Sequence, residues 1–261
     1  MNKKIAAVLV LLMAFFVASS PALAASWNYT AFGDSLAYGS GATNNQGYTD
    51  LYKNYLETDN QATVTLYNLG VPGWKSTDLL SALKTNSTFR QAAAGSDVIT
   101  IDIGGNDLLQ AVYLYKSGIC GGEKNNKCLK TAFKKMKSNW GKIFKLVRKL
   151  RNKKPTIIRT MNLYYSSVTS DQNSDSYSGD GYSSDFAFFN PYLLKANSSL
   201  RKIALKKKIL TADVHLIFNG ASGTEDPQIK GYICNDGLHP NDTGYQLMSG
   251  ALRGLGYTMS K

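Results

Sequence analysis

The chain has 261 residues, of which 43% are hydrophobic and 18% are charged, and its formal net charge at pH 7 is +12. This length suits one domain with a sizeable hydrophobic core. No recognition motif for nucleic acid accompanies the positive charge, so we expect no nucleic-acid partner. The chain has only two histidines and no Cys-x-x-Cys motif, which argues against a zinc site.

The first 24 residues have the organisation of a secretory signal peptide. Two lysines supply the positive charge, residues 5–17 form the apolar core, and small residues precede Ala24. We therefore predict cleavage after Ala24, a secreted protein, and one domain over residues 25–261. A membrane anchor is the alternative, but it needs about 20 apolar residues, which this run does not reach. No later stretch is apolar enough to span a bilayer.

Five apolar runs predict strands, and helical segments alternate with them. The predicted strands are residues 27–32, 62–69, 97–103, 156–163 and 209–214. The predicted helices are residues 48–58, 77–84, 129–151, 191–207 and 242–252. This alternation indicates an α/β fold, in which helices cover both faces of a parallel sheet.

The helix at residues 129–151 shows the clearest periodicity. Apolar side chains recur every three or four residues along it, so one stripe faces a core. Between Lys124 and Lys154 there are thirteen lysines or arginines and no acidic residue. We interpret most of this charge as the solvated face of a helix that covers the sheet. The alternative is attraction to an anionic surface, either a phospholipid membrane or a wall polymer.

A polar segment follows the fourth predicted strand. Residues 166–190 are rich in serine, aspartate and glycine, and acquire three phenylalanines near their end. This composition predicts a long loop. Long loops in compact domains are usually functional or disordered, and we favour a flap on the substrate side.

The three cysteines leave one thiol unpaired. Cys120 and Cys128 flank a short polar loop and are the natural disulfide pair, since a secreted chain can keep disulfides. Cys234 is then free, two residues before Asp236. It could be a nucleophile, but no glycine turn at a strand end holds it, and a buried free cysteine is the commoner case.

Glycine-bearing turns follow the first three predicted strands. They contain Gly-Asp-Ser-Leu at residues 33–36, Asn-Leu-Gly-Val-Pro-Gly at 68–73, and Gly-Gly-Asn-Asp at 104–107. An Asp-Gly-Leu-His sequence stands far downstream at 236–239. In a parallel sheet the three turns open on the same edge, where α/β proteins place their sites.

These four blocks, in this order, resemble the GDSL or SGNH hydrolase family, and the resemblance covers nearly the whole chain after the signal peptide. It implies a flavodoxin-like, three-layer α/β/α sandwich around a five-stranded parallel sheet. The pattern differs from that of α/β-hydrolases, which need Gly-x-Ser-x-Gly, because position 37 is alanine. The resemblance also implies a catalytic triad of Ser35, His239 and Asp236. The implied oxyanion hole is formed by the Ser35 and Gly73 N–H groups and the Asn106 side chain.

The chemistry of the residues is consistent with these roles. A serine hydroxyl needs a base to take its proton, and histidine is the side chain suited to this near neutral pH. Either histidine could be structural, but His239 has an aspartate three residues earlier and a proline next, whereas His215 stands just after the fifth predicted strand. Asp236 could orient the His239 ring, although a backbone carbonyl could do so instead.

Three further acidic residues neighbour the predicted site. We interpret Asp34 and Asp107 as acceptors that stabilise turns. Asp102 lies within an apolar run, and its pattern leaves two possibilities open. It ends the strand near the site, or it pairs with a buried donor.

We therefore predict a secreted, monomeric serine hydrolase that cleaves carboxylic esters through an acyl-serine intermediate, without metal or other cofactor. The substrate would be a lipid, a short acyl ester or an acetylated glycan. A carbohydrate or cell-wall O-acetylesterase is the alternative with the same chemistry. A non-catalytic protein that binds walls or membranes on the same scaffold is the alternative of another class.

Overall fold

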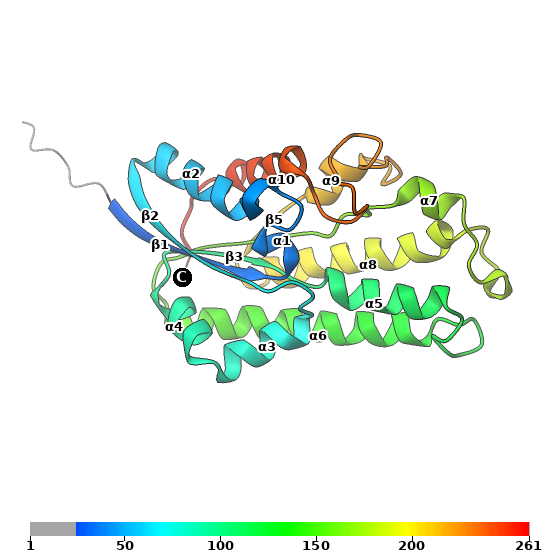
Figure 1. Cartoon of the computed structure of the whole chain (residues 1–261). Coiled ribbons are helices and arrows are strands. Elements are labelled where there is room, and N and C mark those ends of the chain that lie inside the picture. Colours follow the sequence, from blue (N-terminus) through cyan, green and yellow to red (C-terminus); the bar gives the residue numbers. More distant parts are fainter. Residues whose placement is uncertain (1–24, 261) are drawn as a thin grey trace, which may run out of the picture.

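The computed structural model describes residues 25–260, so the predicted signal peptide lies outside the described residues. Five strands form one parallel sheet in the order β2-β1-β3-β4-β5 (Figure 1). They are β1 (Ala25–Gly33), β2 (Ala62–Gly70), β3 (Val98–Asp102), β4 (Ile157–Met161) and β5 (Leu210–Ala212). This order places β1 beside β3, at the point where the direction of the connections reverses. Open α/β sheets bind their ligands at this point.

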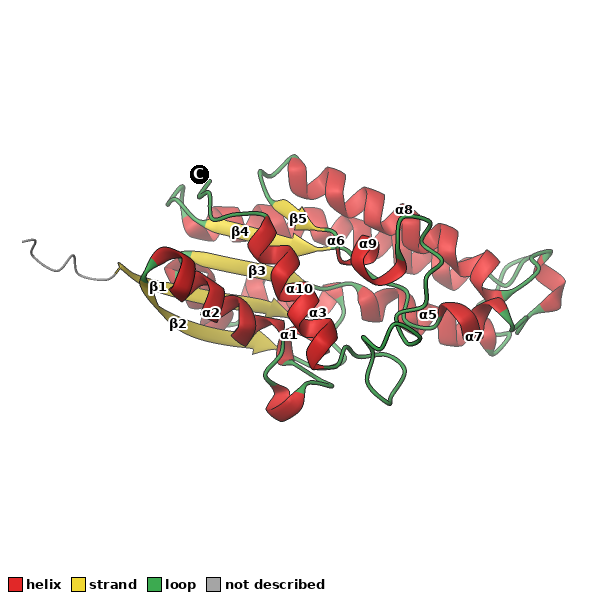
Figure 2. Ribbon diagram, turned by 90° about the horizontal axis from the view of Figure 1, so that it is seen from above, coloured by secondary structure: helices red, strands yellow, loops and turns green. Residues whose placement is uncertain are grey.

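Helices cover both faces of the sheet, which confirms the predicted three-layer α/β/α sandwich (Figure 2). One layer contains α2 (Tyr48–Asn60), α9 (Val214–Asn219) and α10 (Asp242–Gly254). The other contains α3 (Ser76–Thr85), α4 (Ser87–Gly95), α6 (Lys127–Arg151) and α8 (Asp185–Leu205). Three helices follow strand ends: α1 (Ser35–Tyr38), α5 (Gly105–Lys116) and α7 (Val168–Gln172). Short 3₁₀ turns occur at Thr43–Asn45 and Ser178–Asp180.

The apolar stripe of α6 packs into the core as its spacing predicted. Met136, Trp140, Ile143 and Val147 are fully buried. The indole N–H of Trp140 donates to the Ile103 carbonyl at 2.8 Å, so its polar atom is satisfied. All the lysines of α6 are exposed. Among residues 25–260, no helix has both the length and the hydropathy needed to cross a membrane.

The helix α8 begins earlier than the sequence predicted. We predicted this helix at residues 191–207, so that it would start at Pro191. In the structure Pro191 lies inside α8, which begins at Asp185. The Ser184 hydroxyl caps it by accepting from the Ala187 N–H at 3.2 Å.

The polar segment at residues 166–190 contains folded elements, not only a loop. It contains α7, the turn at Ser178–Asp180 and the first residues of α8. The Tyr115 hydroxyl donates to Asp180, and the Lys116 ammonium lies 2.6 Å from Asp171 and 3.3 Å from Asp185. These contacts attach the segment to α5.

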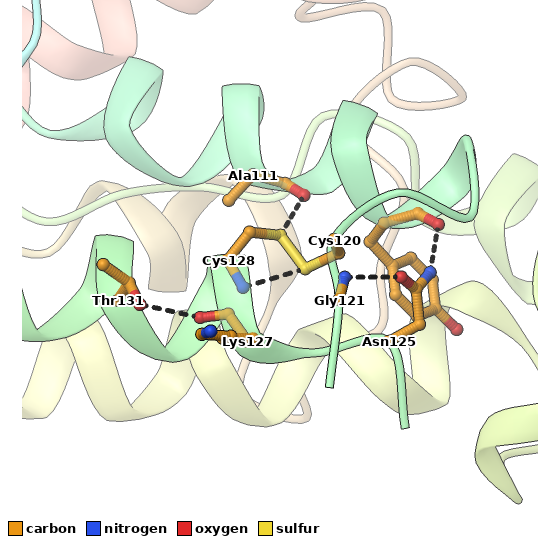
Figure 3. The surroundings of a disulfide bond; sticks show 8 residues. Ala111, Cys120, Gly121, Asn125, Lys127, Cys128 and Thr131 are labelled. Atoms are coloured by element: carbon orange, nitrogen blue, oxygen red, sulfur yellow. Dashed lines mark hydrogen bonds between the residues drawn. A yellow bond between two sulfur atoms is a disulfide. The ribbon is translucent and has the colours of Figure 1, made fainter. Parts of the chain in front are cut away.

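The structure contains the disulfide between Cys120 and Cys128 (Figure 3). It closes the loop that joins α5 to α6, and the sulfur of Cys128 lies 3.1 Å from the Ala111 carbonyl oxygen. Within the loop, the Asn125 side chain accepts from the Gly121 N–H at 3.0 Å and donates to the Tyr115 carbonyl at 2.8 Å. The disulfide therefore joins the loop that follows α5 to the first turn of α6. Both helices extend here past the carboxyl edge of the sheet (Figure 1).

Candidate active site

Ser35 lies at the carboxyl end of β1 and opens α1. The Asp34 carboxylate caps this helix by accepting from the Leu36 N–H at 3.0 Å. At Gly33, a Cβ atom would lie 2.4 Å from the Asp102 carbonyl oxygen, so only glycine allows β1 to approach β3 this closely. Ser35 is 9% exposed at the edge of the sheet.

The structure brings Ser35, His239 and Asp236 together. His239 Nε2 lies 2.9 Å from Ser35 Oγ, and His239 Nδ1 lies 2.5 Å from Asp236 Oδ2. A carboxylate has no proton to give, so Nδ1–H donates to Asp236 and Nε2 is left to accept from the Ser35 hydroxyl. A nucleophile, a base and a group that orients the base are thus in hydrogen-bond contact.

Hydrogen bonds determine the charge of Asp236. Burial raises the pKa of its carboxyl, but donors from the His239 ring and from the His239 and Leu238 N–H groups outweigh burial. They hold the pKa well below its usual range. Asp236 is therefore ionised at neutral pH and accepts the hydrogen bond from His239 Nδ1.

Side chains that the sequence analysis did not single out support the histidine loop. The Tyr164 hydroxyl donates to the Leu238 carbonyl at 2.6 Å. The Gln228 side-chain amide donates to the Gly237 carbonyl at 3.1 Å. Their partners lie more than eight residues away in sequence, and no local motif indicates either contact. Together they fix the backbone that carries His239.

Asn106, at the start of α5, lines the same cavity as Ser35. Its amide nitrogen donates to the Trp74 carbonyl at 3.0 Å and to Asp34 Oδ2 at 3.3 Å. Gly73 does not line this cavity; it precedes Trp74 in the turn after β2. Its φ of +80° is in the left-handed region, which explains the glycine. The structure thus places Asn106 in the same cavity as the serine. Gly73 lies outside the cavity lining, one residue before Trp74, whose carbonyl binds the Asn106 amide.

Asp107 and Asp34 both accept hydrogen bonds from the starts of helices, and Asp107 lies in α5 itself, not in a turn. Asp107 accepts from the Ser76 N–H at 2.7 Å and from the Ser76 hydroxyl at 2.6 Å. Burial raises the pKa of Asp34 to about 7, against the opposing bond from Leu36. Asp34 is therefore partly protonated near neutral pH.

Asp102 ends β3 and lines the cavity, so of the two possibilities the position near the site is correct. It is 3% exposed, and among residues 25–260 no donor reaches its Oδ2 atom. Burial, followed by repulsion from Asp34, raises its pKa well above the usual value. Asp34 and Asp102 are thus two buried carboxyl groups close to the serine turn, and burial together with their mutual repulsion favours the neutral form of Asp102.

His215 and Cys234 do not line the cavity. His215 is buried at the start of α9, where its backbone N–H donates to Asn162 Oδ1 at 2.9 Å. Cys234 is a free thiol, and burial raises its pKa, which disfavours the reactive thiolate. Over residues 25–260, no group of three or more His, Cys, Asp or Glu side chains is placed to hold a metal ion.

A cavity of about 280 Å³ opens beside Ser35. It is bounded by the ends of β1, β3 and β4, by one face of α5, and by α8 and the histidine loop. All three triad residues line this cavity, so a bound ester could present its carbonyl carbon to Ser35.

Comparison with known proteins identifies the family. The chain belongs to the GDSL-like lipase/acylhydrolase family, whose model matches residues 31–247. It is therefore an ester-hydrolysing enzyme. Among curated proteins it is similar to the spore germination lipase LipC of Bacillus licheniformis. The two are 29% identical over 232 residues, covering 88% of this chain and 96% of that protein.

Solved structures agree. The lipase Lip_vut3 from a goat rumen metagenome superposes with a TM-score of 0.72 and 26% identity, over 89% of this chain and 98% of that one. The acetylxylan esterase Axe2 of Geobacillus stearothermophilus superposes with a TM-score of 0.61 and 16% identity, over 91% and 99%. The latter identity supports a shared fold only.

Proposed function

We propose that the protein is a secreted serine esterase of the lipase type, in which Ser35 forms an acyl-enzyme. The observation that carries this proposal is the chain of contacts from Ser35 Oγ to His239 Nε2 and from His239 Nδ1 to Asp236. The sulfur of Cys234 and the ring of His215 lie outside the cavity. Secretion is supported by the signal-peptide pattern of the first 24 residues.

In the first half-reaction, Ser35 Oγ attacks the ester carbonyl carbon while its proton moves to His239 Nε2. The carbonyl oxygen becomes an oxyanion. The Ser35 N–H and the Asn106 amide are the donors we assign to it, with the Gly73 N–H as the third. To do so, the Asn106 amide would give up its longer hydrogen bond, the one to Asp34, and donate to the oxyanion instead. His239 then returns the proton to the leaving alcohol, and the C–O bond breaks.

In the second half-reaction, water attacks the acyl-serine. His239 takes a proton from this water and passes it to Ser35 Oγ as the acid departs, so the enzyme is restored. Throughout, Asp236 stabilises the protonated ring and holds its orientation. No step uses a metal or other cofactor.

The test is hydrolysis of p-nitrophenyl acetate. We expect the wild-type protein to release p-nitrophenol and the Ser35→Ala variant to be nearly inactive. A Ser35→Ala variant that keeps wild-type turnover would overturn the assignment. Hydrolysis of acetylated xylan in preference to p-nitrophenyl esters would favour the carbohydrate O-acetylesterase. Axe2, an acetylxylan esterase, has the same fold.

The exposed lysines of α6 support a second, separate proposal, that this helix attracts the enzyme to an anionic membrane or wall polymer. No ion pair among residues 25–260 neutralises these lysines. Each lysine near such a surface contributes on the order of 1 kcal/mol to binding. The Discussion describes its test.

A further inference from the structure

The cavity beside Ser35 follows one face of α5. Besides Asn106, the α5 residues that line it recur at spacings of three and four: Gly105, Leu108, Leu109, Val112, Tyr113 and Lys116. At a rise of about 1.5 Å per residue, this face extends the cavity for roughly 16 Å from the serine end. The cavity is therefore elongated, with the triad at one end.

The opposite wall is apolar too. Leu163 and Tyr165 follow β4, and Phe189 and Leu193 lie four residues apart on α8. Leu193 is also part of the main hydrophobic core. Two helices and a strand end thus present mainly hydrocarbon to the space between them.

Several polar side chains that line this cavity are already bonded within the protein, while Asp102 at the serine end keeps one oxygen without a donor among residues 25–260. The Tyr165 hydroxyl donates to Asp171 at 2.8 Å, and the Tyr164 hydroxyl donates to the Leu238 carbonyl. At the far end, Lys116 is held between Asp171 and Asp185. A sugar chain here would leave many hydroxyl groups without partners, at a cost for each. An alkyl chain has no such groups.

The triad geometry sets the direction of the chain. The tetrahedral carbon bears four groups: Ser35 Oγ, the oxyanion near Asn106, the leaving oxygen near His239 Nε2, and the acyl carbon. The acyl carbon takes the remaining direction, and the cavity between α5 and α8, which Ser35 and Asn106 both line, is the space available to it. A volume of about 280 Å³ is close to the lower limit of about 300 Å³ for small-molecule pockets, so it suits one chain.

We propose that the cavity between α5 and α8 is the acyl-binding site for a single unbranched medium-chain fatty acyl group. The Lys116–Asp171–Asp185 cluster closes its far end. This inference rests on the proposed function and specifies its substrate class: medium-chain acyl esters and not acetylated glycans.

Two series of esters test the proposal with the wild-type enzyme. In the first, p-nitrophenyl esters run from acetate through butyrate and octanoate to palmitate. Each buried methylene contributes about 0.8 kcal/mol, so kcat/KM should rise roughly four-fold per methylene at first. It should fall at palmitate, when the chain outruns the cavity. In the second, the acyl group stays acetyl and the alcohol lengthens from ethyl to decyl; we expect little change.

The outcomes separate the two proposals. A flat or falling acyl series would overturn the acyl site, as would a rise confined to the alcohol series, which would assign the cavity to the alcohol. Either result leaves acetate hydrolysis, and so the proposed function, in place. Failure to hydrolyse any of the esters would instead overturn the proposed function.

A matched pair of variants locates the site on α5. Leu109 lines the cavity, whereas Leu114 is 37% exposed on the other side of the same helix. Leu109→Trp should lower the octanoate-to-acetate ratio of kcat/KM at least ten-fold, because the larger side chain fills the channel. Leu114→Trp should leave both rates unchanged. An unchanged octanoate-to-acetate ratio in a folded Leu109→Trp variant would overturn the proposal. If that variant does not fold, the p-nitrophenyl ester series with the wild-type enzyme decides.

Discussion

At the scale of single residues, the two histidines provide an internal comparison. His239→Ala should remove nearly all turnover, because the base that takes the Ser35 proton is lost. Combined with Ser35→Ala it should cost little more than either change alone, since the two residues act as a unit. Asp236→Asn should cost less. The measurement is kcat with p-nitrophenyl acetate.

The control is His215→Ala, because His215 is buried outside the cavity and should affect stability more than turnover. Full activity in His239→Ala, together with loss in His215→Ala, would contradict the assignment.

The buried carboxyl pair predicts a dependence of stability on pH. The folded-state pKa of Asp34 is raised to about 7 from 3.8, and that of Asp102 is also raised. Raised carboxyl pKa values mean that the folded state binds more protons than the unfolded state. The contribution of this pair to the free energy of unfolding is therefore fully present below about pH 4. It is lost as pH rises toward 7, at up to about 1.4 kcal/mol per pH unit for each group.

Asp102→Asn tests this, because it keeps the shape and removes one ionisable group away from the triad contacts. The fall in melting temperature between pH 5 and pH 8 should be smaller in the variant than in the wild type. Thermal melts at the two pH values give the comparison. Equal falls in both proteins would show that the pair does not control stability.

At the scale of elements, α6 has two faces of different character. Its apolar stripe packs against the sheet, and its lysines face solvent. Reversing Lys134, Lys137, Lys145 and Lys149 to glutamate should leave that stripe and soluble-ester hydrolysis unchanged. If the lysines dock the enzyme, the variant should lose binding to anionic vesicles, measured by co-sedimentation.

The same four positions changed to arginine provide the control, since the charge is kept and binding should be too. Binding by the wild type should also weaken steeply with salt, because screening has a length of about 8 Å at physiological ionic strength. Equal vesicle binding by the glutamate variant and the wild type would show that the charge only solvates the helix.

At the scale of the whole molecule, secretion and the disulfide are tested by one measurement. The intact mass of the secreted protein should correspond to a chain that begins at Ala25, after cleavage following Ala24. It should lie about two daltons below the fully reduced value, because one bridge removes two hydrogens. Peptide mapping should join Cys120 to Cys128, the pair that the structure shows.

A mass that retains the first 24 residues would refute the predicted cleavage. A peptide in which Cys234 is linked to either of the other cysteines would refute the pairing. The bridge closes a short loop, so it should add no more than roughly 2–3 kcal/mol to the free energy of unfolding.

Much of the fold and the triad could be predicted from the sequence. Strand-length apolar runs and the stripe of α6 identify their elements, because burial imposes a period that is visible locally. Ser35, His239, Asp236 and Asn106 stand in short motifs, and parallel strands bring the ends of β1, β2 and β3 to one edge. The order of four motifs was therefore sufficient to identify the family.

Only the tertiary structure shows what surrounds those motifs. The helix α5 begins within Gly-Gly-Asn-Asp, a sequence typical of a turn, and α8 continues through Pro191, a residue that usually ends or starts a helix. The bonds from Lys116 to Asp171 and from Tyr164 to Leu238 span more than fifty residues. The shape of the cavity depends on such long-range packing, which leaves no local period in the sequence.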